Sequence, residues 1–455
     1  MRFPAGPTIL LIVLFAALGL AGRYLAQSAH TTPDEVVWTF DPYHAATYTQ
    51  ASGRQAALVD IHREQTGKQV QVQLMPARAL DARLLSLILS DARGPDTPDL
   101  VEIEIGSVGK YFRAPPEHSG LLPLESFIAA DPAAWNLLPS RVASWTRSGH
   151  VFGIPRDVHP VTITYRKDLF DEAGVDLSQC LTWAEFQQAC LLYQAYWRER
   201  GTERWAIQLS QWSASELMIM VQQQHVRLID GNGLPDIALA ELARTIAFYA
   251  QLVAGPSKIS YAASSSVSTQ DLADAHTAAL FTPDWRVEYL RWDPDLLGRL
   301  RMVALPRFSP TDARTASWGG TMVSIPKNCR DPQAAWRLLH DLQLTPAALY
   351  ARQYHSSILP AVTSAWTSEV WDRADPLYGG QAIGRLYVTL AEELPEQAVS
   401  PYTMVISQAI SAVLAEAQAH LEKHGNGDLE EFCAGRLAEA QERLVRLTDF
   451  AEGNP

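Results

Sequence analysis

Residues 149–176 read "GHVFGIPRDVHPVTITYRKDLFDEAGVD" and change character within a short span. Residues 161–165 alternate apolar and polar side chains, as expected for a strand with one buried face, and a short helical pattern follows them. Pro155 and Pro160 bracket a polar crossing, 156–159. Proline fixes φ and lacks a backbone donor, so it is typical of strand ends. The stretch therefore predicts a stiff crossing between two groups of strands.

The length of the chain predicts more than one lobe. A chain of 455 residues exceeds what a single hydrophobic core usually supports. We therefore interpret the crossing at 156–159 as a hinge between two lobes, with a ligand bound in the cleft beside it. The formal net charge of −13 argues against nucleic acid as a partner, because phosphate binding requires a basic surface.

The N-terminus predicts export. Arg2 precedes the apolar run "TILLIVLFAALGLA" at 8–21, which is shorter than the roughly 20 residues of a membrane span. Small residues within 26–28 favour cleavage before Ala29, and no cysteine follows the run to carry a lipid. Residues 1–28 are thus a signal peptide or an uncleaved N-terminal membrane anchor, and the protein is expected in the periplasm or elsewhere outside the cytoplasm.

The four cysteines carry no metal-binding pattern. Cys180 and Cys190 are separated by helical sequence over a distance that a disulfide does not span. For Cys329 and Cys433 the sequence allows two alternatives, a disulfide between them or two buried free thiols. No C-x-x-C motif or histidine pair accompanies them, so we expect no metal and no cofactor.

Strands and helices alternate in the first hundred residues. Strand patterns cover 36–40, 70–74 and 99–105, with helical patterns at 52–66 and 80–90 between them. This order predicts parallel strands with crossover helices, the α/β class. In such sheets ligands bind beyond the carboxyl ends of the strands.

The second half of the chain continues this pattern. A buried strand at 278–281 runs directly into Trp285, and the glycine pair Gly319 and Gly320 opens another strand. Amphipathic helices are predicted at 332–342 and, in the tail, at 404–420 and 428–447. No internal repeat is present.

Three stretches resemble a known family when taken together. They are "VFGIPRDVHPVTITYRKDLFDEAGVD" with "LTWAEF" after it, "AALFTPDWRVEYL", and "SWGGTMVSIPKNCRDPQAAWRLLHDL". The chain resembles the extracellular solute-binding proteins of carbohydrate ABC importers, the group that includes maltose-binding protein, from about Val36 to the C-terminal helices. The resemblance implies two α/β lobes, each a sheet flanked by helices, that close on a sugar without catalysis. It also implies membrane permease subunits as partners of a monomeric protein.

The resemblance also implies how the chain divides. Lobe I comprises 34–155 and 320–362, lobe II comprises 160–317 and 374–455, and the hinges lie near 156–159, 318–321 and 362–374. Arg156, Val158, Gly319 and Gly320 are the expected hinge residues. The family usually has asparagine in place of Arg166 and glycine in place of Asp284, which puts the identity of the ligand in doubt.

Sugars present apolar CH faces and a rim of hydroxyls, so they favour aromatic platforms with carboxylates beside them. Trp285, at the end of a buried strand, is the main candidate platform, with core packing as the alternative. Trp38 is as well suited to the core as to binding, and Tyr43 lies beyond the end of its strand. Glu102 and Glu104 share one face of a buried strand, where they bind hydroxyls or form an internal salt bridge.

Further candidates lie in the crossing and at positions that the resemblance marks. Asp157 and His159 bind ligand or form an ion pair at the hinge. The remaining candidates follow strands or begin the tail helix where relatives contact ligand; they are Gln211, Trp212, Trp318 and Tyr402.

Other functions find less support. The motifs H-E-x-x-H, G-x-S-x-G and G-x-x-x-x-G-K-[ST] are absent, and "DGNGLPDIALAE" at 230–241 lacks two features of a calcium loop. A secreted glycosidase needs opposed carboxylates, whereas Glu102 and Glu104 share one strand face. A receptor for a membrane sensor would use the same fold and stays an alternative. No arginine cluster marks the expected cleft, which favours a sugar over a phosphorylated solute.

Overall fold

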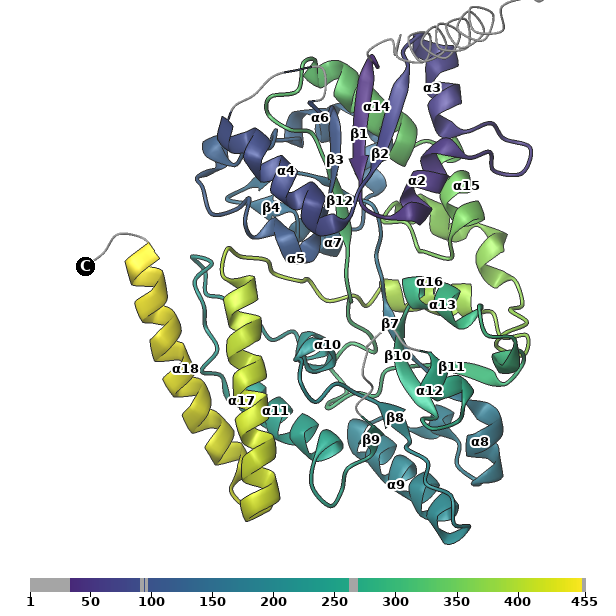
Figure 1. The fold of residues 1–455 in the computed structure, drawn as a ribbon, viewed down its shortest axis with the longest axis vertical. Helices are drawn as coiled ribbons and strands as arrows, with labels where there is room; N and C mark the ends of the chain where they lie inside the picture. Colours follow the sequence, from purple (N-terminus) through teal and green to yellow (C-terminus); the bar gives the residue numbers. More distant parts are fainter. Residues whose placement is uncertain (1–32, 91–93, 95–96, 262–268, 452–455) are drawn as a thin grey trace, which may run out of the picture.

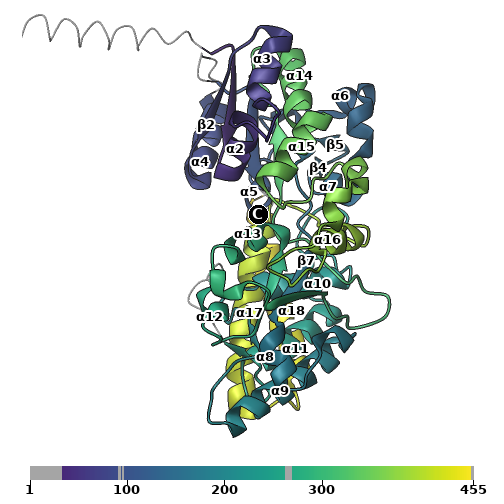
Figure 2. The ribbon, with the colours of Figure 1, turned by 90° about the vertical axis from the view of Figure 1, so that its right-hand side faces the viewer.

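The computed structural model describes residues 33–90, 94, 97–261 and 269–451. Two five-stranded sheets lie one beyond the other along the long axis of an elongated molecule, each with helices against it (Figure 1). The view turned by 90° shows the same two bodies with a narrow waist between them (Figure 2). The predicted two-lobed α/β fold is confirmed.

The first sheet has a parallel half and an antiparallel half. Its strands, in spatial order, are β2 (Val70–Leu74), β1 (Glu35–Thr39), β3 (Leu100–Glu104), β12 (Thr321–Ser324) and β6 (Ile154–Pro155). β1 pairs in parallel with both of its neighbours, whereas β12 runs antiparallel to β3 and β6. The helices nearest these strands in the chain are α2 (Pro42–Thr49), α3 (Leu58–Thr66), α4 (Ala77–Ser90) and α14 (Pro332–Gln343).

The second sheet is built around one long strand. In spatial order it consists of β11 (Leu300–Ala304), β7 (Val161–Arg166), β10 (Ala279–Pro283), β8 (Ile207–Gln208) and β9 (Ser260–Tyr261). The expectation that β7 has one exposed face is wrong, because all six of its residues are buried. β7 pairs with β11 and β10 on its two sides, so it is an interior strand rather than an edge strand.

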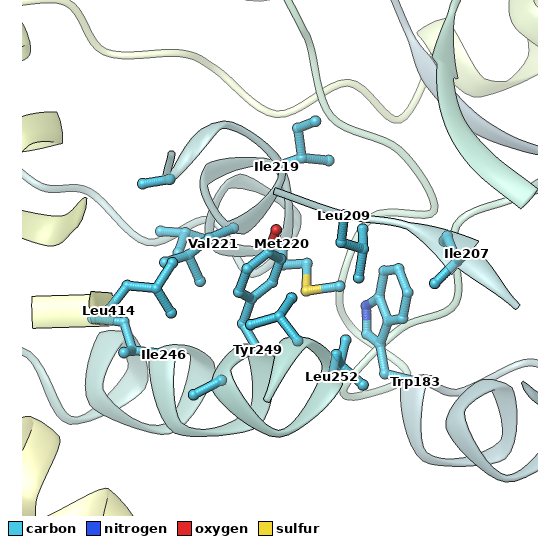
Figure 3. Packing of buried hydrophobic residues seen from close by; sticks show 14 of the residues in the cluster. Trp183, Ile207, Leu209, Ile219, Met220, Val221, Ile246, Tyr249, Leu252 and Leu414 are labelled. Atoms are coloured by element: carbon cyan, nitrogen blue, oxygen red, sulfur yellow. The ribbon is translucent and has the colours of Figure 1, made fainter. Parts of the chain in front are cut away.

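The core of the second lobe joins helices from distant parts of the chain. Trp183 at the start of α9 (Trp183–Glu199) packs with Met220 of α10 (Ser215–Gln223) and Tyr249 of α11 (Ala240–Val253) (Figure 3). The tail helices α17 (Thr403–His424) and α18 (Leu429–Ala451) pack against α11 and complete this cluster. The predicted C-terminal helices therefore belong to the core of this lobe.

Local sequence signals set several element ends as predicted. Thr182 and Glu185 form the capping box of α9, with the threonine hydroxyl accepting from the Glu185 amide and the glutamate accepting from the Thr182 amide. Gly67 ends α3 in the left-handed region at φ 77°. α3 begins at Leu58 rather than at 52, and the sequence reading missed α2, whose N-cap is Asp41.

Three chain segments run side by side at the waist. The Arg156 amide donates to the Thr321 carbonyl at 2.8 Å, and the Val158 amide donates to the Leu359 carbonyl at 3.1 Å. The Trp318 amide in turn donates to the His159 carbonyl at 3.2 Å. The segments 156–159 and 318–321, predicted as crossings, therefore run beside one another and are joined by backbone hydrogen bonds.

The chain returns to the first lobe once more before its tail. α16 (Ile383–Ala391) places Tyr387 in a cluster beneath the second sheet, but Val388 and Leu394 pack in the cluster around the first sheet. The expected bounds assign all of 374–455 to lobe II. Contacts of the first lobe thus extend beyond the predicted third hinge, because the chain passes over both cores here.

Two sequence motifs have ordinary structural roles. The carboxylate of Asp230 accepts from the amides of Asn232 and Leu234, which closes a turn.

No group of three or more metal-ligating side chains occurs in the described part of the chain. Cys329 and Cys433 lie in separate hydrophobic clusters and form no disulfide.

None of the helices among the described residues is both long and apolar enough to cross a bilayer. The apolar run at 8–21 and the proposed cleavage site lie outside the described residues.

Candidate functional site

A cavity of about 200 Å³ lies between the two sheets, beside the waist. One wall comes from residues that follow β1 and end β3, and the other comes from residues that follow β10. Its lining consists of Phe40, Asp41, Tyr43, His44, Glu104, Asp157, His159, Trp285, Glu288, Tyr289, Trp318, Gly319, Gly320, Thr321, Ser356 and Ile358. The cavity thus lies beyond strand ends of both sheets, which is where α/β proteins usually bind a ligand.

The cap of α2 places two aromatic side chains at the first wall. β1 ends at Thr39, and the Asp41 carboxylate then accepts from the amides of Tyr43 and His44 at 2.7 and 3.3 Å. Aspartate is a preferred N-cap because it satisfies amides that the helix leaves without partners. The cap fixes Tyr43 and His44 in the first turn, where both line the cavity.

Glu102 is a buried structural anion behind this wall. It accepts from Thr39 Oγ1 at 2.5 Å, from Tyr48 Oη at 2.6 Å and from His44 Nδ1 at 2.9 Å. Burial raises the pKa of this carboxyl, but His44 and the nearby Arg156 lower it to about 2. Glu102 does not line the cavity, and its bonds are those of the internal ion pair that the sequence left open.

Glu104, two residues further along β3, lies at the cavity instead. Its side chain is exposed and, within the part of the chain that the structure describes, forms no ion pair. Partial burial, together with the carboxylates of Asp157 and Asp81, raises its pKa. A carboxylate without a fixed partner is suited to accept hydrogen bonds from ligand hydroxyls.

His159 forms the centre of a buried ion group at the waist. Its Nδ1 lies 2.6 Å from Asp284 Oδ1, and its Nε2 lies 3.2 Å from Asp157 Oδ2. Burial lowers the pKa of this imidazole, but the two carboxylates raise it to about 10. Asp157 also accepts from the Thr321 amide, and Asp284 accepts from the Leu359 amide. Asp284 was not predicted as a partner of His159, although it was recognised as a departure from the glycine that the family usually has there.

Arg141, in α7 (Pro139–Ala143), joins this group from the side. Its guanidinium donates to the carbonyl oxygens of Asp157 and Gly319 and to Ser317 Oγ, at distances of 2.8 to 3.2 Å. A Cβ on Gly320 would lie 1.8 Å from Arg141 Nη2, and the φ of Gly320 is 143°. Only glycine fits here, because the arginine occupies the space of a side chain.

Aromatic rings form the second wall. The indole N–H of the half-buried Trp285 donates to the Trp318 carbonyl at 3.0 Å. Its ring makes edge contacts with the rings of Trp318 and Tyr289, with centroids 6.1 and 6.2 Å apart. Tyr289 also lines the cavity but was not among the predicted ligand-binding residues. Its position four residues after Trp285 is a signal that could have identified it, because residues four apart share one face of a helix.

The sequence profile of a family described as bacterial extracellular solute-binding protein matches residues 45–347. The chain belongs to this family. The resemblance read from the sequence is thereby confirmed, and the family implies that the protein binds a solute outside the cytoplasm.

Several similar proteins are named for the sugars that they bind. An arabinooligosaccharide-binding protein of Halalkalibacterium halodurans is 20% identical over 386 residues, which cover 83% of this chain and 82% of that protein. The sugar-binding protein MalE of Xanthomonas citri superposes with a TM-score of 0.72 at 20% identity, over 92% of this chain and 99% of its own. The cyclic alpha-maltosyl-1,6-maltose binding protein of Arthrobacter globiformis superposes with a TM-score of 0.70 at 17% identity, over 90% and 99%.

Some predicted ligand-binding residues of this solute-binding protein lie away from the cavity. Trp38 is buried inside β1 with the Arg83 guanidinium 4.5 Å from its ring centroid, and Tyr402 packs in the second-lobe core. The Gln211 amide donates to the Val253 carbonyl, and Trp212 is 81% exposed. None of the four lines the cavity, and their roles in binding stay predictions.

The charge on His159 predicts a pH dependence of stability. Its folded-state pKa is raised above the unfolded value of about 6.5, so its contribution to stability is complete below that pH and is lost as pH rises through about 10. The stability advantage of the wild type over His159→Gln should therefore shrink as pH rises from about 6 to about 10. Urea denaturation of both proteins across this range measures it. An advantage that stays constant would show that folding does not raise the pKa of this imidazole.

Proposed function

We propose that the protein binds a sugar or oligosaccharide outside the cytoplasm with high affinity and delivers it to the permease subunits of an ABC importer. The observation that carries this proposal is the cavity at the waist, with aromatic rings on one wall and the unpaired Glu104 carboxylate at the other. Rings accept the CH faces of a sugar, and carboxylates accept hydrogen bonds from its hydroxyls.

The charges around the cavity favour a neutral ligand. Neither arginine nor lysine is among its lining residues, whereas Asp41, Glu104, Asp157 and Glu288 are. An anionic solute such as a sugar phosphate or a uronic acid would lie beside these carboxylates, and the His159 imidazolium at the cavity is already paired with Asp157 and Asp284. The relatives named for arabino-oligosaccharides support the same ligand class.

We infer that ligand binding closes the two lobes by rotation at the waist. Lobe I is proposed as 34–155 with 320–362 and lobe II as 160–317 with 374–455, apart from the contacts of Val388 and Leu394 with the first core. Arg156, Val158, Gly319 and Gly320 are the proposed hinge residues. Gly319 and Gly320 have φ values of 100° and 143°, which give this segment a freedom that other residues lack.

Residues 1–28 are proposed to export the protein, as a cleaved signal peptide or as an uncleaved anchor. The protein is proposed to act as a monomer, without a cofactor and without turnover of its ligand. The sequence argues against Glu102 and Glu104 as a hydrolytic pair because they share one strand face, and the engagement of Glu102 by protein donors supports the same conclusion.

A panel of neutral mono- and oligosaccharides should contain at least one that stabilises the purified protein. A ligand at about a hundredfold its Kd raises the free energy of unfolding by about 2.7 kcal/mol, which a thermal-shift assay detects. Sugar phosphates and uronic acids at the same concentrations are the matched controls and should give no shift. Stabilisation by the anionic compounds alone would contradict the proposal.

Trp285→Ala should weaken the binding of that sugar at least about tenfold, because truncation removes a stacking surface that sugar would cover. Its fold should be kept, since the side chain is only half-buried at the cavity. Calorimetry measures the affinity, and urea denaturation measures the stability. Trp135→Ala, which removes a 65% exposed tryptophan of the first lobe, is the control and should bind as the wild type does. Unchanged affinity in Trp285→Ala would remove Trp285 from the site.

Saturating sugar should contract the molecule in solution. The lobes are joined by narrow crossings, so a ligand that contacts both walls favours the closed arrangement. Small-angle scattering of the free and bound protein should show a smaller radius of gyration when sugar is bound. Identical curves at proven saturation would indicate a rigid cleft.

A further inference from the structure

We propose that Tyr289 and Trp292 form an outer ligand subsite, so that the protein takes an oligosaccharide whose chain leaves the cavity over α13 (Val287–Leu290). The inference rests on the proposed function and names its ligand class more narrowly. It assigns binding to Trp292, which lies outside the cavity lining.

Four aromatic rings follow one another from the waist to the surface. The ring centroids of Trp318 and Trp285 are 6.1 Å apart, those of Trp285 and Tyr289 are 6.2 Å apart, and those of Tyr289 and Trp292 are 5.1 Å apart. Each pair meets edge to face, with interplanar angles of 72° to 86°. In this arrangement one ring supports the next without covering both of its faces. The rings therefore form a continuous path rather than a closed stack.

Exposure increases toward the outer end of this path. Trp285 and Tyr289 are half-buried at the cavity, whereas Trp292 is 69% exposed. A single exposed tryptophan needs no explanation by itself, because much of any protein surface is apolar. Here the exposed ring directly continues a wall of the ligand cavity, and this continuity distinguishes it from the similarly exposed Trp135.

The size of the cavity decides how much of a long ligand it can enclose. Its volume of about 200 Å³ is below the roughly 300–1,000 Å³ of pockets that enclose a ligand of drug size. A ligand of several sugar units would therefore extend beyond it. Tyr43 and Tyr289 line the cavity from opposite walls, and the pKa of Tyr43 is raised by burial and by the nearby Glu288 and Tyr289.

Polar groups lie beside the outer rings. The Glu288 carboxylate accepts from Ser357 Oγ at 2.5 Å and lies 3.4 Å from the Arg291 guanidinium. Arg291 in turn donates to both carboxylate oxygens of Asp375, at 3.2 and 2.6 Å. Of these groups Glu288 lines the cavity together with Tyr289, so its fixed carboxylate can accept hydrogen bonds from ligand hydroxyls. Aromatic surface bordered by fixed polar groups is what a sugar chain requires.

The test compares affinity with ligand length. Arabino-, malto- and galacto-oligosaccharides of two to six units are titrated by calorimetry into the full chain and its Trp292→Ala and Trp135→Ala variants. In the series that binds, wild-type affinity should increase with length. Trp292→Ala should weaken the longest member on the order of tenfold and leave the shortest within about twofold, as expected for loss of one aromatic anchor. Trp135→Ala should match the wild type at every length.

Three outcomes overturn the inference. Equal loss at every length in Trp292→Ala would show a general effect rather than an outer subsite, and full retention of long-chain affinity would show that Trp292 does not touch the ligand. Wild-type affinity that is independent of length would confine the ligand to the cavity. The proposed function survives all three, because a short sugar still binds. Only the failure of every sugar to bind would overturn the proposed function together with this inference.

Discussion

A buried imidazolium between two buried carboxylates determines how the two lobes meet. A buried charge that loses its partner costs several kcal/mol, so His159, Asp157 and Asp284 each depend on the other two. Asp284 follows β10 of the second sheet, whereas Asp157 accepts the amide of Thr321, the first residue of β12 in the first sheet. The ion group therefore couples the ends of both sheets. It does so at the cavity between the two sheets, which Asp157 and His159 line.

The same ion group accounts for unusual backbone at the waist. His159 has a φ of 57°, a region that side chains other than glycine seldom adopt and that persists where surrounding contacts determine it. Its two carboxylate partners provide those contacts. Arg141 places a further buried cation against the crossing, and the space it takes leaves room only for glycine at 320. Charge thus fixes the segment 156–159, and hydrogen bonds from Arg141 to the Gly319 carbonyl and from the Thr321 amide to Asp157 join the glycine segment to it.

The sequence predicts those features that depend on local pattern. Strand ends at β1, β2 and β3 were predicted to within a residue or two, because apolar runs and turn residues mark them. Trp285 was predicted to contact ligand because it follows the end of a buried strand, and His159 because it lies in the crossing. Partners were not predictable in the same way. Arg141 lies 176 residues from Ser317 in the chain, and His44 lies 58 residues from Glu102, so neither contact leaves a periodic signal. α2 was missed since its eight residues begin at Asp41, where the strand pattern has just ended.

Glu102 and Glu104 show why position along a strand decides what a side chain can do. Both project from the same face of β3, and the sequence cannot distinguish them. Glu102 lies two residues before the end of the strand, where Thr39, His44 and Tyr48 donate hydrogen bonds to it. Burial raises its pKa, but His44, Arg156 and the bond from Thr39 lower it to about 2. Glu104 ends the strand, is exposed at the cavity and has a raised pKa. The first carboxylate therefore holds the wall together, and the second remains available to a ligand. The proposed sugar binding rests on Glu104 and on the aromatic rings of the opposite wall, because a carboxylate accepts hydrogen bonds from hydroxyls and rings cover the CH faces of a sugar.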